Sequence, residues 1–418
     1  MAPMMDNIVS YVRMVGRRKY HYRPTGKVMN ICIVSDLFDS SYGGVPVVVN
    51  RFIQRLVERG HKITIVTSKC KSREAVEKKE NFTVYRFSSF TLPKSEGEYA
   101  LSFPSFHRIR KIFEREGIDV IHCHVPSFLS LACVLEARKM GVPSIATNHL
   151  LSETFSRNLF FDSAKFNEFF YKMVNVFYNL VDIVLCPSTY GLRTLRANGL
   201  NTRAFVLSNG IELSKFNPNL NHEQFDRQFG LKEENKKILY VGRLMEEKGL
   251  DVLIKAYSIV NAKVPNTNLI IVGKGHMRNN LEGLANRLGL ENVIFTGFVS
   301  DSMVRQAYAT SDLFVLPSYA EIQPLVLLEA LAMGLPAIGT NVGGIPEMIT
   351  EGQNGYILNP GDHEGLAERI ITVLSDDGLR KEFSRNSLKI ARDNDIEKSA
   401  DKLERLYHRL TSRISARM

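Results

Sequence analysis

The chain has 418 residues, of which 44% are hydrophobic and 23% are charged, and its formal net charge at pH 7 is +10. At roughly 150 residues per domain, this length predicts two or three domains. The composition is typical of a soluble globular protein with a large core, and it excludes a low-complexity disordered chain. The charge indicates an acidic partner, and nucleic acid, anionic lipid and phosphorylated substrates all fit it.

Residues 1–27 form a basic N-terminal extension in which six arginines and lysines stand against a single aspartate. Its segment "NIVSYVRMVGRRKYHYR" joins an apolar turn or two to a basic cluster, a pattern typical of segments that bind an anionic membrane surface. A disordered basic tail is the alternative. The charges follow the apolar stretch, so we do not expect a secretory signal. No run reaches the roughly 18 apolar residues that a spanning helix needs.

The five cysteines form no CxxC pair, and most of them lie inside apolar runs. We therefore expect small core residues in a reducing, cytoplasmic compartment. Any contact with a membrane would then be peripheral, on its cytoplasmic face.

Residues 28–212 alternate short apolar runs with helical stretches such as 45–59 and 103–116. The runs are rich in Ile and Val and are continuous rather than alternating, which is typical of parallel strands covered on both faces. This βαβ repetition predicts a Rossmann-like, doubly wound domain. The expected strands are "NICIVSD", "KITIVTS", "FTVYRF", "DVIHCH", "PSIATNH", "DIVLCPS" and "AFVLSNG".

The same pattern restarts at 237–395, after a polar segment at 213–236 that we expect to be a linker. Residues 396–418 are expected to form a basic helix that packs back towards the first domain. The fold class is therefore α/β, with two Rossmann-like domains facing across a cleft, and ligands of such sheets bind outside the carboxyl ends of the strands. The expected strands of the second domain are "ILYVGR", "NLIIVGKG", "NVIFTGF", "DLFVLPS", "PAIGTN" and "GYILNP".

Two turns at strand ends are candidate phosphate sites. Gly43 and Gly44 lie in a β-to-α turn that opens a helix, where backbone N–H groups favour an anion, although a plain glycine turn is the alternative. Arg243 and Lys248 lie five positions apart in "VGRLMEEKG", a strand-to-helix loop. Two cations there suit a diphosphate. A solvated charged loop is the alternative, because two glutamates lie between them.

Three histidines fall at strand ends. His122 and His124 share one face, and His149 ends the next strand and points towards the cleft. A zinc site needs three or four ligands, and no partner set has metal-like spacing. We therefore expect no metal site, and core or cleft-lining histidines are favoured.

A helix that is apolar all round carries a single carboxylate, that of Glu329. Pro324 fits the first helical position, and the helix is expected to end at Gly334. A helix of this kind is buried, and an ionised carboxylate within it needs hydrogen-bond partners. Glu329 therefore either caps nearby backbone or binds ligand hydroxyls. Glu321 lies in the preceding loop, at the cleft.

The spacing of Glu321 and Glu329, E-x7-E, is the most specific motif of the chain. Together with the turn at 43–44, "GRLMEEKG" and "NVGGIPE", it resembles the retaining GT-B nucleotide-sugar glycosyltransferases of the family 4, group 1 type, which include the glycolipid mannosyl- and glucosyltransferases. The resemblance extends from Asn30 to the C-terminus. It implies transfer of a hexose from a UDP- or GDP-sugar, with retention and with neither a metal ion nor another cofactor.

The resemblance also implies roles for single residues. Arg243 and Lys248 would neutralise the donor diphosphate, Glu329 would take the ribose hydroxyls, Glu321 would contact the transferred sugar, and His149 would lie near the reacting sugar. The donor-binding set that it implies is Gly43, Gly44, Arg243, Lys248, Gln323, Pro324, Leu325 and Glu329.

This chain departs from the family at Gln323 and Pro324. The family often has an aromatic residue and a glycine there, and Pro324 has no N–H to offer a phosphate. Glycolipid-directed members look more like E-x-Q, as in this chain.

The acceptor is expected to meet the first domain. Residues 155–178 hold nine aromatics with interleaved basic residues, and burial in a helix accounts for at least half of them. An exposed remainder would suit a lipid, so we expect a membrane-lipid acceptor at an anionic surface. A soluble or polysaccharide acceptor, a GT-B nucleotide-sugar epimerase and a non-catalytic sensor are alternatives.

We expect no nucleic-acid partner, because the basic excess is concentrated in a tail and no nucleic-acid-binding motif appears. The sequence leaves the oligomeric state open.

Overall fold

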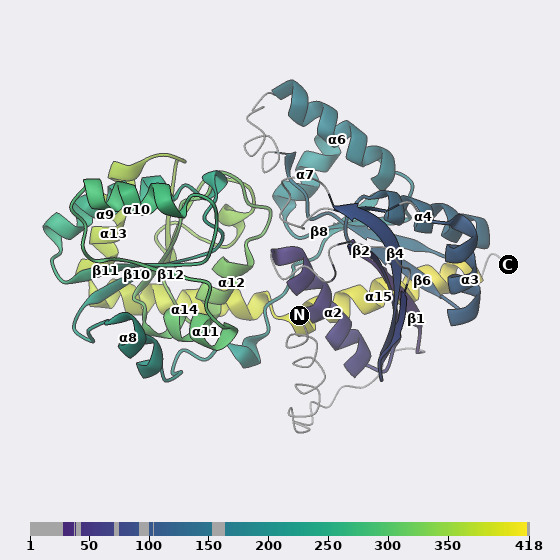
Figure 1. The fold of residues 1–418 in the computed structure, drawn as a ribbon, viewed down its shortest axis with the longest axis horizontal. Helices are drawn as coiled ribbons and strands as arrows, with labels where there is room; N and C mark the ends of the chain where they lie inside the picture. The colour runs from purple at the N-terminus through teal and green to yellow at the C-terminus, as the bar shows by residue number, and fades with distance from the viewer. Residues whose placement is uncertain are drawn as a thin grey trace.

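The computed structural model describes residues 28–36, 38, 43–70, 75–91, 100–102, 104–152 and 164–415. Two α/β domains lie side by side, and a long C-terminal helix runs from the second domain back beneath the first (Figure 1). The basic extension and the aromatics Phe155, Phe160 and Phe161 lie outside the described residues. Within the described residues, no helix is long and apolar enough to cross a membrane.

The described part of the first domain contains a sheet of nine strands in the order β3-β4-β2-β1-β6-β7-β8-β9, with β5 beside β4. All seven predicted strands are present and mutually parallel: β1 (Asn30–Val34), β2 (Lys62–Cys70), β4 (Phe82–Thr91), β6 (Val120–Cys123), β7 (Ser144–Thr147), β8 (Ile183–Cys186) and β9 (Arg203–Val206). The sequence did not predict β3 (Ala75–Lys78) and β5 (Ala100–Ser102), which pair antiparallel with β4. Both are short, and β3 alternates in burial, so neither shows a continuous apolar run.

Helices cover the faces of this sheet: α2 (Gly44–Glu58), α3 (Phe106–Glu116), α4 (Phe128–Met140), α6 (Ala164–Tyr178) and α7 (Thr189–Ala197). Three of them begin at a serine whose hydroxyl accepts a backbone N–H three residues later, which satisfies a donor left open by the first turn: Ser105, Ser127 and Ser188.

The second domain has a parallel sheet in the order β12-β11-β10-β13-β14-β15. Its strands match the six predicted ones: β10 (Lys236–Val241), β11 (Thr267–Val272), β12 (Val293–Gly297), β13 (Leu313–Leu316), β14 (Ala337–Thr340) and β15 (Gly355–Leu358). Its helices are α9 (Leu250–Lys263), α10 (Arg278–Arg287), α11 (Asp301–Thr310), α12 (Leu325–Ala332), α13 (His363–Ser375) and α14 (Asp377–Asp393), with short 3₁₀ turns η2 (Glu246–Lys248) and η3 (Ile345–Glu347). This domain confirms the doubly wound arrangement.

The segment 213–236, expected as a linker, is folded onto the second domain. It contains η1 (Leu213–Lys215) and α8 (Glu223–Phe229). Phe225 is fully buried in the core of the second domain, and its backbone N–H donates to Gln306 Oε1 of α11 at 3.0 Å. One buried aromatic residue is enough to attach a short helix to the domain. The polar composition of the rest of the segment gave no sign of it.

The C-terminal helix α15 (Ile396–Ser415) completes the core of the first domain (Figure 1). Its residues Ile396, Leu403 and Tyr407 are buried in one cluster with Phe52 of α2 and Ile31 of β1. The chain therefore crosses between the domains twice, and Ile211 and Asp395 pair where the two crossings meet.

Candidate active site

The candidate site lies where the strand order of the second sheet reverses. β10 pairs with β11 on one side and with β13 on the other, so the loops that follow β10 and β13 leave the same edge in opposite directions. Such a switch point is where doubly wound sheets bind ligands. The first loop carries Arg243 and Lys248, and the second carries Glu321, so the topology brings these predicted residues together.

Lys248 and Glu321 form an ion pair at this point. Lys248 Nζ lies 2.7 Å from Glu321 Oε1, and the Ser318 hydroxyl donates to the same oxygen at 3.0 Å. The two charged side chains are only 15% and 12% exposed, so the attraction is screened less than it would be at an open surface. A cation and a carboxylate held together in this way can contact a phosphate and a sugar hydroxyl of one ligand.

Arg243 lies beside a buried glutamate. Its Nη2 is 3.3 Å from Glu247 Oε1, and Glu247 is fully buried, whereas the Arg243 side chain is 35% exposed. Of the two glutamates in this loop, Glu246 is in the solvent-exposed position and pairs with His276. The loop is therefore not simply a solvated charged segment, because the buried carboxylate of Glu247 holds the Arg243 guanidinium in place.

Glu329 on α12 has side-chain partners from two other elements. Arg51 Nη2 of α2 donates to its Oε1 at 2.9 Å, and the Tyr308 hydroxyl of α11 donates to its Oε2 at 3.3 Å. Burial raises the pKa of Glu329, and the adjacent Arg51 guanidinium opposes that rise. The need of this carboxylate for partners is met, and one of those partners comes from the other domain.

The segment before α12 makes hydrogen bonds to residues 208–209, where the chain passes from the first domain to the second. Gln323 Oε1 accepts the backbone N–H of Asn209 at 2.7 Å, and Gln323 Nε2 donates to the Ser208 hydroxyl at 3.1 Å. Pro324 is the N-cap of α12 rather than its first helical residue, and its carbonyl accepts the N–H of Leu327 at 3.2 Å. The side chain of Gln323 therefore ties the two domains together in this structure.

The glycine turn of the first domain faces this segment. Gly43 has φ 103°, a conformation that favours glycine, and it is the N-cap of α2. A Cβ on Gly44 would lie 3.6 Å from Leu325 Cδ1, so the starts of α2 and α12 approach each other across the domains. Both helix N-termini, with their open N–H groups, thus point to one region.

The "NVGGIPE" segment packs against the loop that carries Glu321. A Cβ on Gly343 would lie 1.6 Å from the Glu321 carbonyl oxygen, and one on Gly344 would lie 2.1 Å from that of Ile322. Only glycine permits this approach. The motif resembled a family signature, but the sequence assigned no role to Glu347 at its end, whose carboxylate contacts the first domain.

The histidines of the first domain form a stacked group. His124 Nδ1 lies 3.1 Å from His149 Nε2, and His122 makes 2.7 Å hydrogen bonds with the hydroxyls of Thr147 and Tyr407. Burial lowers the pKa of His149 to about 4 and that of His122 to about 3, so both rings are neutral at neutral pH. Across the described residues, no group of three or more His, Cys, Asp and Glu side chains is arranged to hold a metal ion.

Helix α6 carries the described part of the aromatic segment. Phe170, Tyr171, Phe177 and Tyr178 are buried, and the sequence favoured burial for at least half of the nine aromatics. The exposed apolar side chains are Phe169 at 66%, Met173 at 53% and Val176 at 69%, which lie on one side of the helix at spacings of four and three.

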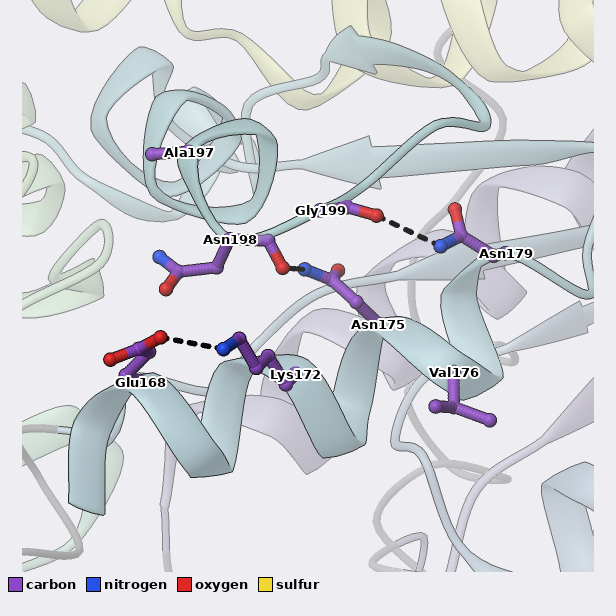
Figure 2. Close-up of a pocket in the computed structure, with 8 residues that line it drawn as sticks. All are labelled: Glu168, Lys172, Asn175, Val176, Asn179, Ala197, Asn198 and Gly199. Carbon is purple, nitrogen blue, oxygen red and sulfur yellow. Dashed lines mark hydrogen bonds and ion pairs between the residues drawn. The ribbon is translucent and has the colours of Figure 1, made fainter. Parts of the chain in front are cut away.

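A surface groove of about 490 Å³ runs between α6 and α7 beside these residues (Figure 2). Its polar side chains have partners within the protein. Lys172 pairs with Glu168 at 2.6 Å, and the amides of Asn175 and Asn179 donate to the backbone carbonyls of Asn198 and Gly199, which follow α7. The lining of the groove is thus mostly polar, and its exposed apolar residues are Val176 and Ala197.

Comparison with known proteins assigns both halves of the chain. The family described as Glycosyltransferase Family 4 matches residues 42–215, and the family described as Glycosyl transferases group 1 matches residues 221–390. The chain is 29% identical over 349 residues to the phosphatidylinositol N-acetylglucosaminyltransferase gpi3 subunit of Schizosaccharomyces pombe, covering 82% of this chain and 72% of that protein. Some of its other relatives are longer, and the chain spans less than two thirds of their length.

Two further matches widen the range of similar proteins. The chain is 28% identical over 354 residues to N-acetyl-alpha-D-glucosaminyl L-malate synthase of Bacillus anthracis, covering 82% of this chain and 87% of that one. Among solved structures, Anabaena Alr3699/HepE in complex with UDP and glucose superposes with a TM-score of 0.71 at 20% identity, covering 90% of this chain and 99% of that one. The chain therefore belongs to the GT-B glycosyltransferases, with a family 4 first domain and a group 1 second domain.

Proposed function

We propose that the protein transfers a hexose from a UDP- or GDP-sugar to a membrane lipid or glycolipid, with retention of configuration and without a metal ion or other cofactor. The observation that carries this proposal is the meeting of Lys248 and Glu321, 2.7 Å apart, at the switch point of the second sheet. A paired cation and carboxylate at that edge suit the two chemically distinct halves of a sugar diphosphate, its anionic leaving group and its hydroxyl-bearing ring.

The donor would lie between the loops that follow β10 and β13. In this proposal Arg243 and Lys248 bind the diphosphate, Glu321 accepts hydrogen bonds from the transferred sugar, and Glu329 accepts them from the ribose. The starts of α2 and α12, at Gly43–Gly44 and Leu325, add backbone N–H groups and positive helix ends. Pro324 offers no such group, so the contact that the family often makes there passes to its neighbours.

The chemical step would be assisted mainly by electrostatics. As the bond between the sugar and the diphosphate breaks, negative charge grows on the leaving oxygen, and the fixed cations Arg243 and Lys248 stabilise it without rearranging. Their carboxylate partners hold both cations in place before the donor arrives. This is the role that a divalent cation would otherwise serve.

His149 would act from the first domain as a neutral hydrogen-bonding group. Because its pKa is lowered to about 4, the ring carries no charge at neutral pH and would contact the sugar without repelling the cations of the second domain. The 3.1 Å contact with His124 fixes its orientation.

The lipid acceptor is supported by the exposed apolar side of α6 and by the name of the Schizosaccharomyces pombe relative, which describes a transferase acting on phosphatidylinositol. Phe169, Met173 and Val176 would enter the interfacial layer of an anionic membrane, with Lys165 and Lys172 on the same exposed face. The enzyme would then work as a peripheral protein on the cytoplasmic face.

A soluble acceptor is the second candidate. It is favoured by the similarity to a protein whose name describes an L-malate product, and by the polar lining of the groove between α6 and α7. A small hydroxy acid would need no membrane contact, so the two candidates predict different behaviour towards lipid vesicles.

The test is to incubate the purified protein with a panel of UDP- and GDP-sugars, once with a total lipid extract and once with soluble hydroxy acids and sugars, and to identify products by mass. A glycosylated lipid supports the proposal, and a product formed only from soluble acceptors establishes the second candidate. A matched pair of variants, Phe169→Ser on α6 and the similarly exposed Phe298→Ser in the second domain, separates membrane docking from general surface effects. Only the first is expected to weaken binding to anionic vesicles and transfer to lipid.

A further inference from the structure

Arg51 of α2 reaches across the domain boundary into the site of Glu329. Its Nη2 lies 2.9 Å from Glu329 Oε1, and its Nη1 donates to the Gly210 carbonyl at 3.1 Å. The side chains of Arg51 and Glu329 are 12% and 15% exposed. One guanidinium thus binds the carboxylate of the second domain and the backbone of the interdomain crossing at once, which only a planar, forked donor set can do.

Gly210 lies where the chain first passes between the domains, and it is packed tightly against the second passage. It has φ 73°, and a Cβ there would lie 2.8 Å from the Ile396 backbone, where the chain returns to the first domain. The bond from Arg51 to Gly210 therefore fixes the arginine relative to both segments that join the domains. If the domains separated, Arg51 would leave with α2 while Glu329 remained on α12, and a largely buried carboxylate would lose its only cationic contact among the described residues.

We propose that Arg51 is a positioning residue of the donor site, which orients the Glu329 carboxylate for the nucleotide and makes that site complete only when the two domains are closed. This inference rests on the proposed ribose role of Glu329. A carboxylate has about four lone-pair positions, so bonds from Arg51 and Tyr308 leave capacity for the hydroxyls of a ribose. Domain closure and nucleotide binding then favour each other.

The charge state of Glu329 gives this role a distinctive signature. The charged or titratable groups that face it are Arg51 on α2, and Tyr308 and Asp301 on α11. Burial and Asp301 raise the pKa of Glu329, and Arg51 opposes them. Without Arg51 the carboxyl would take up a proton at higher pH, and a protonated carboxyl is a poorer acceptor for hydroxyls. Nucleotide binding would then weaken as pH falls.

The experiment is calorimetric titration of the full chain with UDP and with GDP at pH 6.5 and pH 8.5. For Arg51→Met we expect binding at least about tenfold weaker than wild type at pH 6.5, the size of a lost charged hydrogen bond, and a smaller ratio at pH 8.5. Arg51→Lys keeps the positive charge beside Glu329. We expect the ratio of its nucleotide affinity to that of wild type to be the same at both pH values. Ionisation of the nucleotide affects the affinity of variant and wild type equally, so it does not change the ratio of the two affinities at a given pH.

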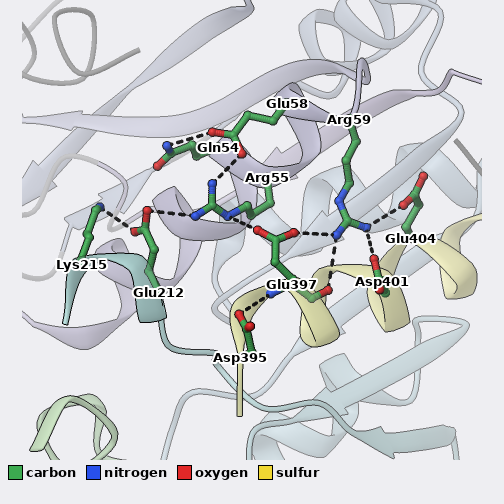
Figure 3. A network of polar contacts seen from close by, with 10 residues as sticks. All are labelled: Gln54, Arg55, Glu58, Arg59, Glu212, Lys215, Asp395, Glu397, Asp401 and Glu404. Atoms are coloured by element: carbon green, nitrogen blue, oxygen red, sulfur yellow. Dashed lines mark hydrogen bonds and ion pairs between the residues drawn. The ribbon is translucent and has the colours of Figure 1, made fainter. Parts of the chain in front are cut away.

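Arg55 provides the matched control on the same helix. It is also a largely buried arginine at the domain boundary, paired with Glu212 at 2.9 Å and Glu397 at 2.8 Å, but its network faces α15 and the crossing rather than α12 (Figure 3). Arg55→Met therefore removes the ion pairs of Arg55 at the same domain boundary, with Glu58, Glu212 and Glu397, and leaves Glu329 untouched. We expect its nucleotide affinity relative to wild type to be the same at both pH values.

Tighter nucleotide binding in Arg51→Met would overturn the inference, since Arg51 would then be a competitor that the nucleotide must displace. An equal loss at both pH values, or a pH dependence shared with Arg55→Met, would also overturn it. Glu329→Gln separates this inference from the proposed function. Weak binding in Glu329→Gln with normal binding in Arg51→Met removes the inference alone, and normal binding in both removes the ribose role as well.

Discussion

The carboxylate of Glu347 in the second domain accepts a 2.7 Å hydrogen bond from the backbone N–H of Tyr190 in the first. Its other oxygen accepts the N–H of Thr189 at 2.8 Å. These are two of the open donors in the first turn of α7, which Ser188 caps from within its own domain. An acidic group at a helix N-terminus is favourable, so the second domain supplies part of the cap for a helix of the first.

The first prediction concerns this shared cap. Glu347→Ala removes the charge opposite the α7 N-terminus, so we expect nucleotide binding to weaken by about threefold and the average separation of the domains to increase. Calorimetry with UDP and GDP measures the first effect, and the radius of gyration from small-angle scattering measures the second. Glu368→Ala, an exposed glutamate on α13, is the control and should change neither. An unchanged radius of gyration in Glu347→Ala would show that the cap does not hold the domains.

Lys248→Met is expected to reduce sugar transfer by about 100-fold or more, because it removes a preorganised cation from the leaving diphosphate. The measurement is initial rate of product formation at saturating donor. Lys255→Met on α9 is the control, since its exposed pair with Asp251 lies outside the strand-end loops, and it should retain wild-type activity. A Lys248→Met enzyme with a normal rate would contradict the proposed catalytic role.

Glu321→Gln keeps the size of the side chain and removes its charge. We expect UDP or GDP to bind with near wild-type affinity and transfer to fall by about 100-fold, because this carboxylate is proposed to act on the sugar rather than on the nucleotide. Calorimetry and rate measurements on one preparation separate the two quantities. Loss of nucleotide binding with little loss of turnover would reverse the assignment. Glu282→Gln on α10, whose side chain is 37% exposed, is the control and should alter neither quantity.

The buried histidines predict a pH-dependent stability. The folded-state pKa of His122 is lowered to about 3, below the roughly 6.5 expected when the chain is unfolded. The unfolded chain therefore takes up this proton first, and its stabilising contribution, present above pH 6.5, is lost as pH falls from about 6.5 to 3. Each such histidine contributes a slope of about 1.4 kcal/mol per pH unit inside that window.

The check is thermal unfolding of wild type and His122→Gln between pH 7 and pH 4. The variant is expected to be less stable at pH 7, because Tyr407 and Thr147 lose their partner, yet its stability should fall less steeply with acid. Asn175→Ala on α6 is the control, because it also removes a buried hydrogen-bonding side chain but no titratable group, and it should keep the wild-type slope. Identical slopes in wild type and His122→Gln would show that His122 does not remain neutral in the folded protein.

The sheets were predictable because parallel strands buried on both faces leave continuous Ile- and Val-rich runs, as in β1 and β11. The strand-end residues Lys248 and Glu321 were predictable as neighbours for the same reason, since strand order at a switch point determines which loops meet. Strand β3 was missed because an exposed edge strand carries no such run. Phe225 was missed because a single apolar residue in a polar segment has no periodicity to detect.

The contacts between the domains were not predictable from local sequence. Arg51 and Glu329 are 278 positions apart, and nothing in the sequence of α2 distinguishes the arginine that faces α12 from Arg55, which faces α15. The same holds for Glu347, whose partners are backbone N–H groups and leave no trace in side-chain identity. The double glycine before it was the available signal, since Gly343 and Gly344 mark a close approach of backbones.

The position of α15 also sets an order of events during synthesis. Tyr407 and Leu403 complete the core that contains β1 and α2, yet the ribosome makes them only after the whole of the second domain. The second domain can therefore finish folding on the nascent chain while the first still exposes the apolar side chains that α15 will cover. A chaperone that acts on this protein would be expected to engage the earliest-made half for the longest time.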